Sequence, residues 1–414
     1  MLEMYFKDPE CLASHRAGLL GAYIDSFVER AGAAGYPREG VRRQCWIIRD
    51  FGLWLERSGV EIGELDDSLI GSYLDERGRG GLVGGSGRAT LRFLVEHLKA
   101  LGVALAEPAP ASSPLERFLG GYSEYLKVQR GLAATTVDYY LTYARRFLGE
   151  RFGEDGPLAF RDLQASDVSD FVLRWAHSQS PGRAKLMVTA LRALHRFLLE
   201  RGQIEVDLAG AVPTVPDWRL SSVPKYLPRE QVERLLSNGV HDTATGRRDR
   251  AILLLLARLG LRAGEVVALE LDDIDWRAGE INVRGKGSLH DRLPLLADVG
   301  EALAAYLSQD RPSCTTRRIF VRARAPIRGF AGSAAISTIV SKALRRAGLN
   351  PATKGPHLLR HSLATGMLRS GASMPEIGQV LRHRHPNTTE IYAKVDFASL
   401  RRLAQPWPVA RGER

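Results

Sequence analysis

The stretch PHLLRHSLATGMLR, residues 356–369, indicates most about the fold and chemistry of this chain. It opens with a proline, which is favoured at the first position of a helix, and Gly371 follows it, so a helix over 356–369 is predicted. Within that helix His357 and Arg360 are three residues apart and share one face. One turn then presents a proton carrier beside a forked cation that can hold a phosphate. His361 points about a quarter turn away from Arg360 and is interpreted as structural.

Four further stretches of the same region carry a tyrosine and basic residues. They are LARLGLRAGEV with Arg262, VRGKGS with Lys286, VLRH with His383 and EIYAKV with Tyr392. A phosphate diester is anionic and a poor electrophile. Attack by a protein hydroxyl therefore requires cations that hold its oxygens and groups that carry protons. Arginines, a lysine and histidines supply both, so the five stretches together predict a site that breaks a phosphodiester bond.

Three of these assignments leave alternatives open. Arg284 and Arg292 flank the predicted hairpin tip at Lys286, where a lysine is ordinarily a solvated turn residue, and either could replace it. His383 lies nine residues before Tyr392, whereas His385 lies seven before it.

The nucleophile also has competitors among the tyrosines of residues 224–414. Tyr226 and Tyr306 are the others, and most tyrosines in helices simply pack their rings in a core. Neither follows a sequence similar to the TTEI that precedes Tyr392. The local sequence therefore favours Tyr392.

Charge is distributed unevenly along the 414 residues. Residues 1–110 carry 13 basic and 16 acidic side chains, and residues 111–223 carry 14 and 13. Residues 224–414 carry 31 and 18, so the excess of +13 lies in the segment with the candidate site. A polyanion is the natural partner of such a segment, although solvated arginines on a basic domain would give the same count.

Composition predicts a cytoplasmic protein of two or three domains. The chain is 44% hydrophobic, enough for real cores, and it has no run of 18 apolar residues that would suggest a membrane span. The first ten residues, MLEMYFKDPE, lack the features of a secretion signal. The cysteines, which lie far apart and are odd in number, favour reduced thiols: Cys11, Cys45 and Cys314.

Two proline-rich linkers divide the chain into residues 1–104, 114–212 and 224–414. The first two parts share one helical plan. A glycine-led run enters an amphipathic helix at 35–41 and again at 131–137, and later segments match at offsets between 95 and 98. This spacing favours a duplicated helical domain, although chance similarity between short helical bundles could produce the same matches.

The third part mixes helices with a small sheet. Helices are expected over 249–259 and from Ala263, and a hairpin over 280–284 and 291–295. Residues 319–321 are expected to add a strand. Ser373 and a glutamate three residues later predict a capping box at the start of another helix. The fold class is therefore mainly α with a small β-sheet (α+β).

These stretches, in this order, resemble the tyrosine recombinase (phage integrase) family. The segment GLRAGE at 260–265 is close to the family pattern glycine-leucine-arginine-x-small-glutamate, and Tyr392 stands in a threonine-x-isoleucine-tyrosine context. The family usually has leucine-glycine-histidine where this chain has Leu381-Arg382-His383. The resemblance covers roughly residues 114–400.

The resemblance implies a function and a role for each residue. Tyr392 would attack DNA to give a 3′-phosphotyrosine, while Arg262 and Arg360 hold the non-bridging oxygens and His383 adds a hydrogen bond. Lys286 would protonate the leaving 5′ oxygen and His357 would accept the tyrosine proton. Glu265 would orient the Arg262 fork. No metal, ATP or other cofactor is implied, and the chain has no Walker motif.

The resemblance also implies partners and a domain plan. The substrate would be double-stranded DNA, bound by a homotetramer on paired sites, with related recombinases as further partners. Residues 114–212 would be the core-binding domain and 224–414 the catalytic domain, with 396–404 exchanged between subunits. Residues 1–104 would be an additional DNA-binding or assembly domain.

Within this family the expected role is that of an integrase or transposase of a mobile element, acting in the cytoplasm on nucleoid DNA. The alternatives are a type IB topoisomerase-like enzyme, a chromosome-dimer resolvase and a non-enzymatic DNA-binding protein. A resolvase usually lacks an extra domain such as 1–104, which favours the mobile element.

Overall fold

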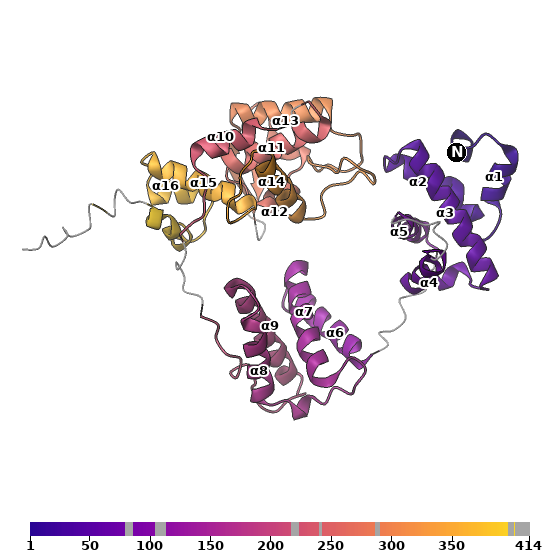
Figure 1. Cartoon of the computed structure of the whole chain (residues 1–414), viewed down its shortest axis with the longest axis horizontal. Helices are drawn as coiled ribbons and strands as arrows, with labels where there is room; N and C mark the ends of the chain where they lie inside the picture. Colours follow the sequence, from indigo (N-terminus) through magenta and orange to yellow (C-terminus); the bar gives the residue numbers. More distant parts are fainter. Residues whose placement is uncertain are drawn as a thin grey trace, which may run out of the picture. The chain divides into compact units, whose positions relative to one another are not determined.

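The structure is a computed structural model of the whole chain. It describes residues 1–78, 86–103, 113–216, 223–239, 242–285, 290–395 and 401, and it is mainly helical with one small antiparallel sheet (Figure 1). This confirms the predicted fold class. No described helix combines the length and the apolar character needed to cross a membrane.

The chain divides into two compact units. The described residues of Met1–Gly52 and Ser222–Arg414 form one, and those of Leu53–Ser221 form the other. The boundary after residue 221 lies in the second predicted linker. The other boundary lies inside helix α3 (Arg38–Arg57), away from the first predicted linker at 104–114. The three-part division therefore stays a prediction.

The first hundred residues are helical. Helix α3 buries one face, on which every third or fourth residue is apolar, as the sequence predicts. These buried residues are Val41, Cys45, Ile48, Phe51 and Leu55. The other helices here are α1 (Pro9–Arg16), α2 (Ile24–Ala33), α4 (Asp67–Gly78) and α5 (Gly87–Ala100).

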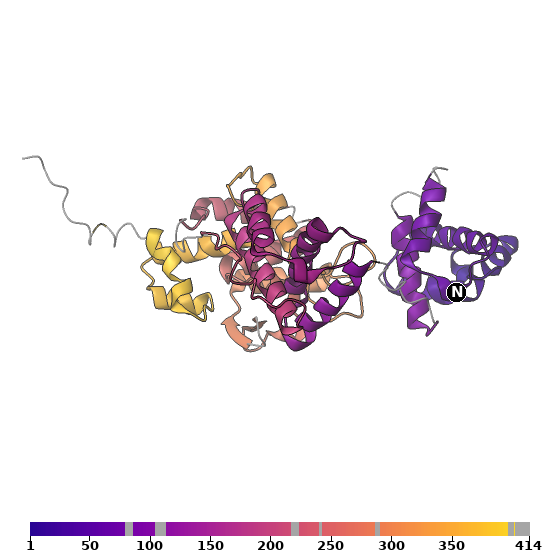
Figure 2. The same ribbon diagram turned by 90° about the horizontal axis from the view of Figure 1, so that it is seen from below.

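Residues 113–212 form a helical bundle. Its helices are α6 (Pro114–Glu124), α7 (Ala134–Phe152), α8 (Ala165–Ala176) and α9 (Pro181–Glu200). Helix α7 packs on both α6 and α9, and α8 packs on α9. The four helices are labelled in Figure 1, and Figure 2 shows the chain turned by 90°. Their shared core includes Val137, Phe147 and Leu191.

The order of elements in this bundle repeats that of the preceding segment. A long helix, a short 3-10 turn and two further helices follow one another as α3, Ile62–Glu64, α4 and α5. The same order recurs as α7, Phe160–Asp162, α8 and α9. Gly35 and Gly131 both have positive φ before their long helices. The recurrence agrees with the duplication inferred from sequence spacing.

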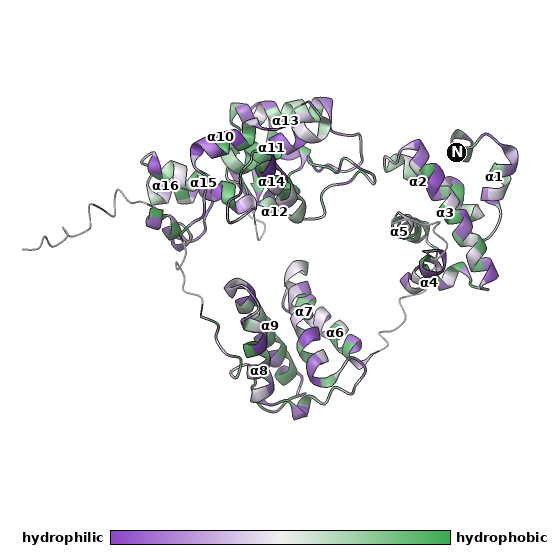
Figure 3. Cartoon of the chain, viewed as in Figure 1, coloured by the Kyte–Doolittle hydropathy of each residue, from purple (hydrophilic) through white to green (hydrophobic). Residues whose placement is uncertain are grey.

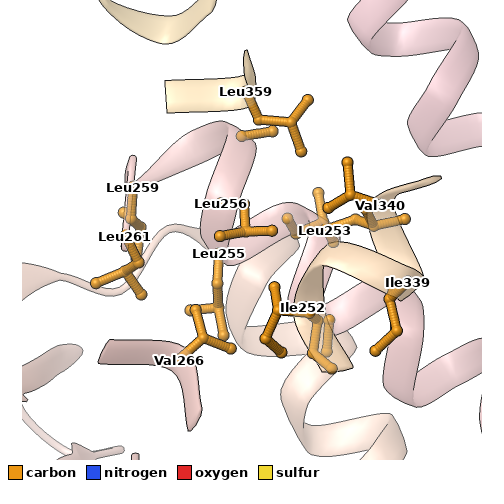
Figure 4. Close-up of a cluster of buried hydrophobic side chains, with 14 of the residues drawn as sticks. Ile252, Leu253, Leu255, Leu256, Leu259, Leu261, Val266, Ile339, Val340 and Leu359 are labelled. Atoms are coloured by element: carbon orange, nitrogen blue, oxygen red, sulfur yellow. The ribbon is translucent and has the colours of Figure 1, made fainter. Parts of the chain in front are cut away.

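The basic C-terminal part is built around helix α11 (Ala244–Arg258). Residues 251–257 are all buried, because α10, α13, α14 and α15 surround this part of the helix. A helix that is hydrophobic all round is expected at such a centre, and Figure 3 shows the apolar part of α11 in green. Figure 4 shows Leu255 against Val266 and Leu256 near Leu359.

The helices that surround α11 and carry the site have these bounds: α10 (Arg229–Ser237), α12 (Ala263–Ala268), α13 (Ala297–Gln309), α14 (Ala334–Arg346), α15 (Pro356–Arg369) and α16 (Met374–Val380). A 3-10 segment, η8 (Glu390–Val395), follows. The predicted helix over 356–369 is confirmed residue for residue.

A three-stranded antiparallel sheet lies beside these helices in the order β1-β2-β3. The hairpin of β2 (Glu280–Arg284) and β3 (His290–Pro294) confirms the expected one, although β3 begins and ends one residue before the expected 291–295. In its register Ile281 lies opposite Leu293. Strand β1 (Ile274–Asp275) was not predicted because two residues carry no alternation.

Two sequence expectations differ from the structure. Helix α11 begins at Ala244 rather than at 249, because the Thr243 hydroxyl accepts the Gly246 N–H at 3.1 Å and caps it. The strand expected over 319–321 is absent from the described sheet. Val321 instead makes one isolated bridge to Gly329. The apolar run is buried by helix packing rather than by strand pairing.

Candidate active site

Arg360 is the buried cation of the candidate site. Helix α15 leaves its side chain 4% exposed. Its Nη1 donates to the carbonyl oxygen of Gly260 and its Nη2 to that of Leu381. The pKa of Arg360 is lowered to about 10, mainly by burial and to a smaller extent by repulsion from Arg262 and Arg382. The guanidinium therefore stays protonated at neutral pH. The guanidinium is therefore anchored on backbone carbonyls of two other segments.

Gly260 has no room for a side chain. Its φ is 59°, and a Cβ would come within 2.8 Å of Leu381 Cδ2 and 3.0 Å of Leu363 Cδ2. The glycine lets the chain turn sharply between α11 and α12 while its carbonyl oxygen faces Arg360. This explains physically why a glycine precedes Arg262 by two residues.

Arg262 caps the start of α12 and is held by Glu265. Its Nη1 donates to Glu265 Oε1 at 2.6 Å, and its backbone N–H donates to Glu265 Oε2 at 2.8 Å. The Arg262 side chain is 41% exposed, whereas that of Glu265 is 5% exposed. Burial opposes ionisation of Glu265, but Arg382 and Arg262 outweigh it and lower its pKa. The buried carboxylate thus orients an arginine that opens to solvent.

Arg382 occupies the turn after α16 in a left-handed conformation with φ 54°. The His383 N–H donates to the Gly378 carbonyl at 2.9 Å and that of Arg382 to the Gln379 carbonyl at 2.9 Å, a helix end that usually takes glycine. A residue with a Cβ pays about 1–2 kcal/mol in this conformation. The Arg382 side chain compensates by donating to Glu265 Oε2 at 2.7 Å.

Tyr392 lies in η8 with 1% of its side chain exposed. Its hydroxyl is 2.9 Å from Nδ1 of His361, and the two rings meet edge to face. Tyr392 belongs to one buried cluster with Ala364, Ile377 and Leu381. Burial raises the pKa of Tyr392 to about 12, against a smaller opposing effect of Arg360, so the hydroxyl is neutral at pH 7.

His383 is tied to the tyrosine segment through Thr389. Its Nδ1 lies 2.8 Å from the Thr389 hydroxyl, and the Thr389 carbonyl accepts the Tyr392 N–H at 3.0 Å. The pKa of His383 is lowered to about 4, mainly by burial and next by the charges of Arg360 and Arg262. The imidazole is therefore neutral at pH 7 and can donate only through its other nitrogen when Nδ1 accepts.

His357 has an exposed side chain on the first turn of α15. The pKa of His357 is lowered, mainly by desolvation and next by the charges of Arg360 and Arg262. His361 follows it by four residues and so lies on the same side of the helix. Burial, His357 and Arg360 lower the pKa of His361 as well. Both imidazoles are consequently biased toward the neutral form that accepts a proton.

The structure brings five of the six predicted residues into one electrostatically coupled group. The charges of Arg262 and Arg360 act on His357 and His383, and that of Arg360 acts on Tyr392. The sixth, Lys286, lies outside the described residues, as does the predicted exchange segment 396–404 apart from residue 401.

The alternatives raised from sequence have different surroundings. Arg284 is engaged by Glu270 and Asp273 at 3.1 and 2.9 Å, whereas Arg292 is 76% exposed. Tyr306 is buried in the core around α11, and the Tyr226 hydroxyl takes a hydrogen bond from Arg369.

Two residues near this group were not singled out as functional from sequence. His361, interpreted as structural, is the residue that contacts the Tyr392 hydroxyl. The four-residue separation from His357 was the signal that could have found it. Arg382 stood out only as a departure from glycine, and nothing local predicts its bond to Glu265.

The chain is similar to known proteins along most of its length. Residues 225–399 match the phage integrase family, and residues 119–202 match the phage integrase N-terminal SAM-like domain. The protein y4rA of Sinorhizobium fredii (strain NBRC 101917 / NGR234), named as an integrase/recombinase, is 45% identical over 394 residues. That match covers 94% of this chain and 95% of y4rA.

Two further similarities concern this fold. Tyrosine recombinase XerD of Mycobacterium tuberculosis (strain ATCC 25618 / H37Rv) is 35% identical over 303 residues, covering 69% of this chain and 95% of XerD. The crystal structure of XerH bound to its palindromic difH substrate, a post-cleavage complex, has a TM-score of 0.54 at 19% identity. It covers 69% of this chain and 83% of XerH, and it shows a shared fold. The chain therefore belongs to the phage integrase family of tyrosine recombinases, site-specific recombinases that cleave and rejoin DNA through a tyrosine intermediate.

Proposed function

We propose that Tyr392 is the nucleophile of this recombinase and that the enzyme serves a mobile DNA element as its integrase or transposase. The observation that carries the first part is the position of the Tyr392 hydroxyl. It is hydrogen-bonded to His361 and interacts with the charge of Arg360, and its segment also holds His383 through Thr389. A nucleophile, two arginine forks and neutral imidazoles then lie in one group.

The proposed reaction is a transfer of the phosphoryl group in two symmetrical steps. The Tyr392 oxygen bonds to phosphorus while the bond to the 5′ oxygen breaks, and His357 takes the tyrosine proton. Lys286 gives a proton to the leaving 5′ oxygen. In the second step the 5′-hydroxyl of the partner strand attacks the 3′-phosphotyrosine and gives its proton to Lys286. The bond from phosphorus to the Tyr392 oxygen breaks, and His357 returns the proton to that oxygen. The energy of the broken bond is kept in the covalent link.

Arg262 and Arg360 would hold the non-bridging oxygens. The two side chains are anchored differently. Arg360 is buried and donates to two backbone carbonyls, whereas Arg262 is partly exposed and pairs with the buried carboxylate of Glu265. Positions held this firmly cost little reorganisation when charge develops in the transition state. His383 would add one further hydrogen bond from the nitrogen that Thr389 does not engage.

The buried nucleophile implies a movement before cleavage. Tyr392 is 1% exposed, so a phosphate cannot reach its hydroxyl in this arrangement. DNA binding must therefore release Tyr392 from His361 and turn it toward the arginines. His361 in this scheme holds the hydroxyl until DNA is present.

The three predicted parts would divide the work on DNA. Residues 224–414, with their excess of +13, and the bundle at 114–212 would grip the duplex, and residues 1–104 would act in assembly or as a further DNA contact. XerH is a DNA-bound relative in fold. By this analogy the partner would be double-stranded DNA. The family resemblance adds a homotetramer on paired sites, acting in the cytoplasmic nucleoid.

The extent of the similarities supports the mobile-element role. A match over 94% of this chain, as with y4rA, must include most of residues 1–104, whereas XerD matches 69% of the chain. The relative y4rA, which is named as an integrase/recombinase, therefore shares the extra N-terminal part. A type IB topoisomerase-like enzyme would relax one duplex without joining a partner.

The test is to incubate the purified chain with its flanking genomic DNA and to sequence every covalent protein–DNA junction. We expect a 3′-phosphotyrosine at one defined position and, with two sites, exchanged strands. Tyr392→Phe should bind the same DNA and form no adduct, whereas Tyr226→Phe should still form it. An adduct with Tyr392→Phe would reject Tyr392 as the nucleophile. Relaxation of a single duplex without exchange would favour the topoisomerase.

A further inference from the structure

Arg382 lies beside the two proposed phosphate-binding arginines and is almost completely buried. Its side chain is 5% exposed, and Nη2 donates to Glu265 Oε2 at 2.7 Å. Its Nε lies 3.8 Å from Asp291 Oδ2, an ion pair too long for a hydrogen bond. One side chain thus reaches from the turn after α16 to helix α12 and to strand β3.

Two arginines share one buried carboxylate at this point. Glu265 Oε1 accepts from Arg262 Nη1, and Oε2 accepts from both the Arg262 backbone N–H and Arg382 Nη2. With only Arg262 beside it, Glu265 would compensate that guanidinium completely. Arg382 supplies a second cation, so Glu265 divides its charge between two guanidinium groups, while the longer ion pair with Asp291 offsets part of the charge of Arg382. Arg262 is therefore not fully compensated by Glu265 and can attract an anion.

The backbone of the same turn serves the other arginine. The carbonyl of Leu381, the residue before Arg382, accepts Arg360 Nη2. The residue after it is His383, whose N–H closes the turn on Gly378. The backbone conformation of Arg382 therefore determines the position of the carbonyl that anchors Arg360 and the position of His383.

The cost of this conformation indicates that the side chain has a task. A φ of 54° is open to glycine without penalty, whereas a residue with a Cβ is strained there. A glycine would close the turn equally well but would leave the second oxygen of Glu265 without its buried cation. The contact with Glu265 is therefore what an arginine at this position supplies and a glycine could not.

We propose that Arg382 is a positioning residue of the phosphate-binding centre, which holds Arg262 in its working orientation through Glu265. This role rests on the proposed function of the site. Arg382 touches neither the tyrosine nor the phosphate in this scheme. It acts by sharing Glu265 with Arg262 and by shaping the turn that anchors Arg360.

The test compares Arg382→Lys, Arg382→Met and Arg382→Gly in the full-length chain. Lys and Met share the backbone strain and differ in charge, while Gly removes the strain together with the charge. Cleavage is measured in single turnover on a nicked duplex that contains the mapped junction. We expect Met and Gly to lower the cleavage rate constant about tenfold or more, as for neighbours in one ionic network, and Lys to recover most of it. Gly should unfold at a higher temperature than Met.

A second measurement separates positioning from simple support of the fold. In a Glu265→Gln background, Arg382→Met should add little further loss, because the route through Glu265 is already cut. On a scissile phosphate in which a methyl group replaces one non-bridging oxygen, the phosphate is neutral and needs less cationic help. The defects of Arg382→Met and Arg262→Ala should therefore shrink together on that substrate. The control is Arg317→Met, which breaks an exposed ion pair with Asp272 and should cleave at the wild-type rate.

The outcomes distinguish failure of the Arg382 role from failure of the proposed function of the site. If the wild-type chain forms no covalent junction, the proposed function fails and this role fails with it. If the wild type cleaves and Arg382→Met cleaves equally fast, only the role of Arg382 is rejected. The role is also rejected if the losses from Arg382→Met and Glu265→Gln are additive, or if the Arg382→Met defect is unchanged on the neutral phosphate.

Discussion

Nδ1 of His361 lies 2.9 Å from the hydroxyl oxygen of Tyr392, and the two rings meet at 61° with centroids 5.6 Å apart. Burial raises the pKa of the tyrosine to about 12 and lowers that of the histidine. Both groups are therefore neutral at pH 7, and the hydroxyl can donate to the free lone pair of Nδ1. The histidine that contacts the Tyr392 hydroxyl is thus His361 and not His357, to which the family resemblance assigns the proton.

Variants of His361 and His357 should separate hydrogen bonding to the Tyr392 hydroxyl from acceptance of its proton. His361→Phe leaves the Tyr392 hydroxyl buried without its partner, which should cost about 1–3 kcal/mol of stability in urea unfolding. His357→Gln should leave stability nearly unchanged, because this side chain is exposed. Its cleavage rate should fall about 10²–10⁴-fold if it accepts the proton. A larger loss of cleavage in a folded His361→Phe chain would instead make His361 the acceptor.

The two arginines should differ in their effect on stability. Arg262→Ala and Arg360→Ala should each slow single-turnover cleavage by roughly 10²–10³, the usual effect of losing an oxyanion-type contact. Arg360→Ala should also lower the unfolding temperature, because the carbonyls of Gly260 and Leu381 lose their buried donor. Arg262→Ala should unfold closer to wild type, since Arg382 still pairs with Glu265. DNA affinity should change little in either variant, and a near-wild-type cleavage rate would remove that arginine from the site.

Local signals were sufficient for much of the catalytic part. Pro356 at the first position and Gly371 with φ 90° bound α15, and Ser373 and Glu376 cap α16 through bonds between their own atoms. The basic stretches also supplied five residues that lie in one group in the structure, whereas His361 and Arg382 were not among those predicted. Such features depend on neighbours within one or two helical turns.

Features that depend on distant residues could not be predicted. The bond from Arg382 to Glu265 joins positions 117 apart, and that from Arg360 to Gly260 joins positions 100 apart. The apolar run at 319–321 looks the same whether a helix or a strand covers it. The burial of Tyr392 likewise follows from the packing of α15, α16 and η8, which no single stretch encodes.

Stability should decrease as pH falls below neutrality. The folded chain keeps His383 neutral down to a pKa of about 4, mainly through burial, while an unfolded histidine takes a proton near pH 6.5. The unfolded state therefore binds more protons between these values, and the stabilisation present above pH 6.5 is lost as pH falls toward 4. Thermal unfolding from pH 7.5 to 4.5 should show this loss.

His383→Gln should flatten that pH dependence, whereas the exposed His290→Gln on β3 should leave it as in wild type. An equally steep loss of stability in His383→Gln would assign the dependence to other groups. His15, whose pKa burial also lowers to about 4, is the next to test, followed by His361 and His357, whose pKa values are lowered as well.

Lys286 as the general acid can be tested by changing the leaving group. Its role is to protonate the departing 5′ oxygen, so it becomes dispensable when a sulfur atom bridges that position, because a thiolate leaves without a proton. Lys286→Ala should therefore be slow on ordinary DNA and largely rescued on the bridging-sulfur duplex. Arg360→Ala should not be rescued to the same degree, since it acts on the non-bridging oxygens. Equal defects of Lys286→Ala on both substrates would reject the assignment. Arg292 would then be the better candidate acid, because it is 76% exposed and its one ion pair, with Glu280, is 3.7 Å long, whereas Arg284 is engaged by both Glu270 and Asp273.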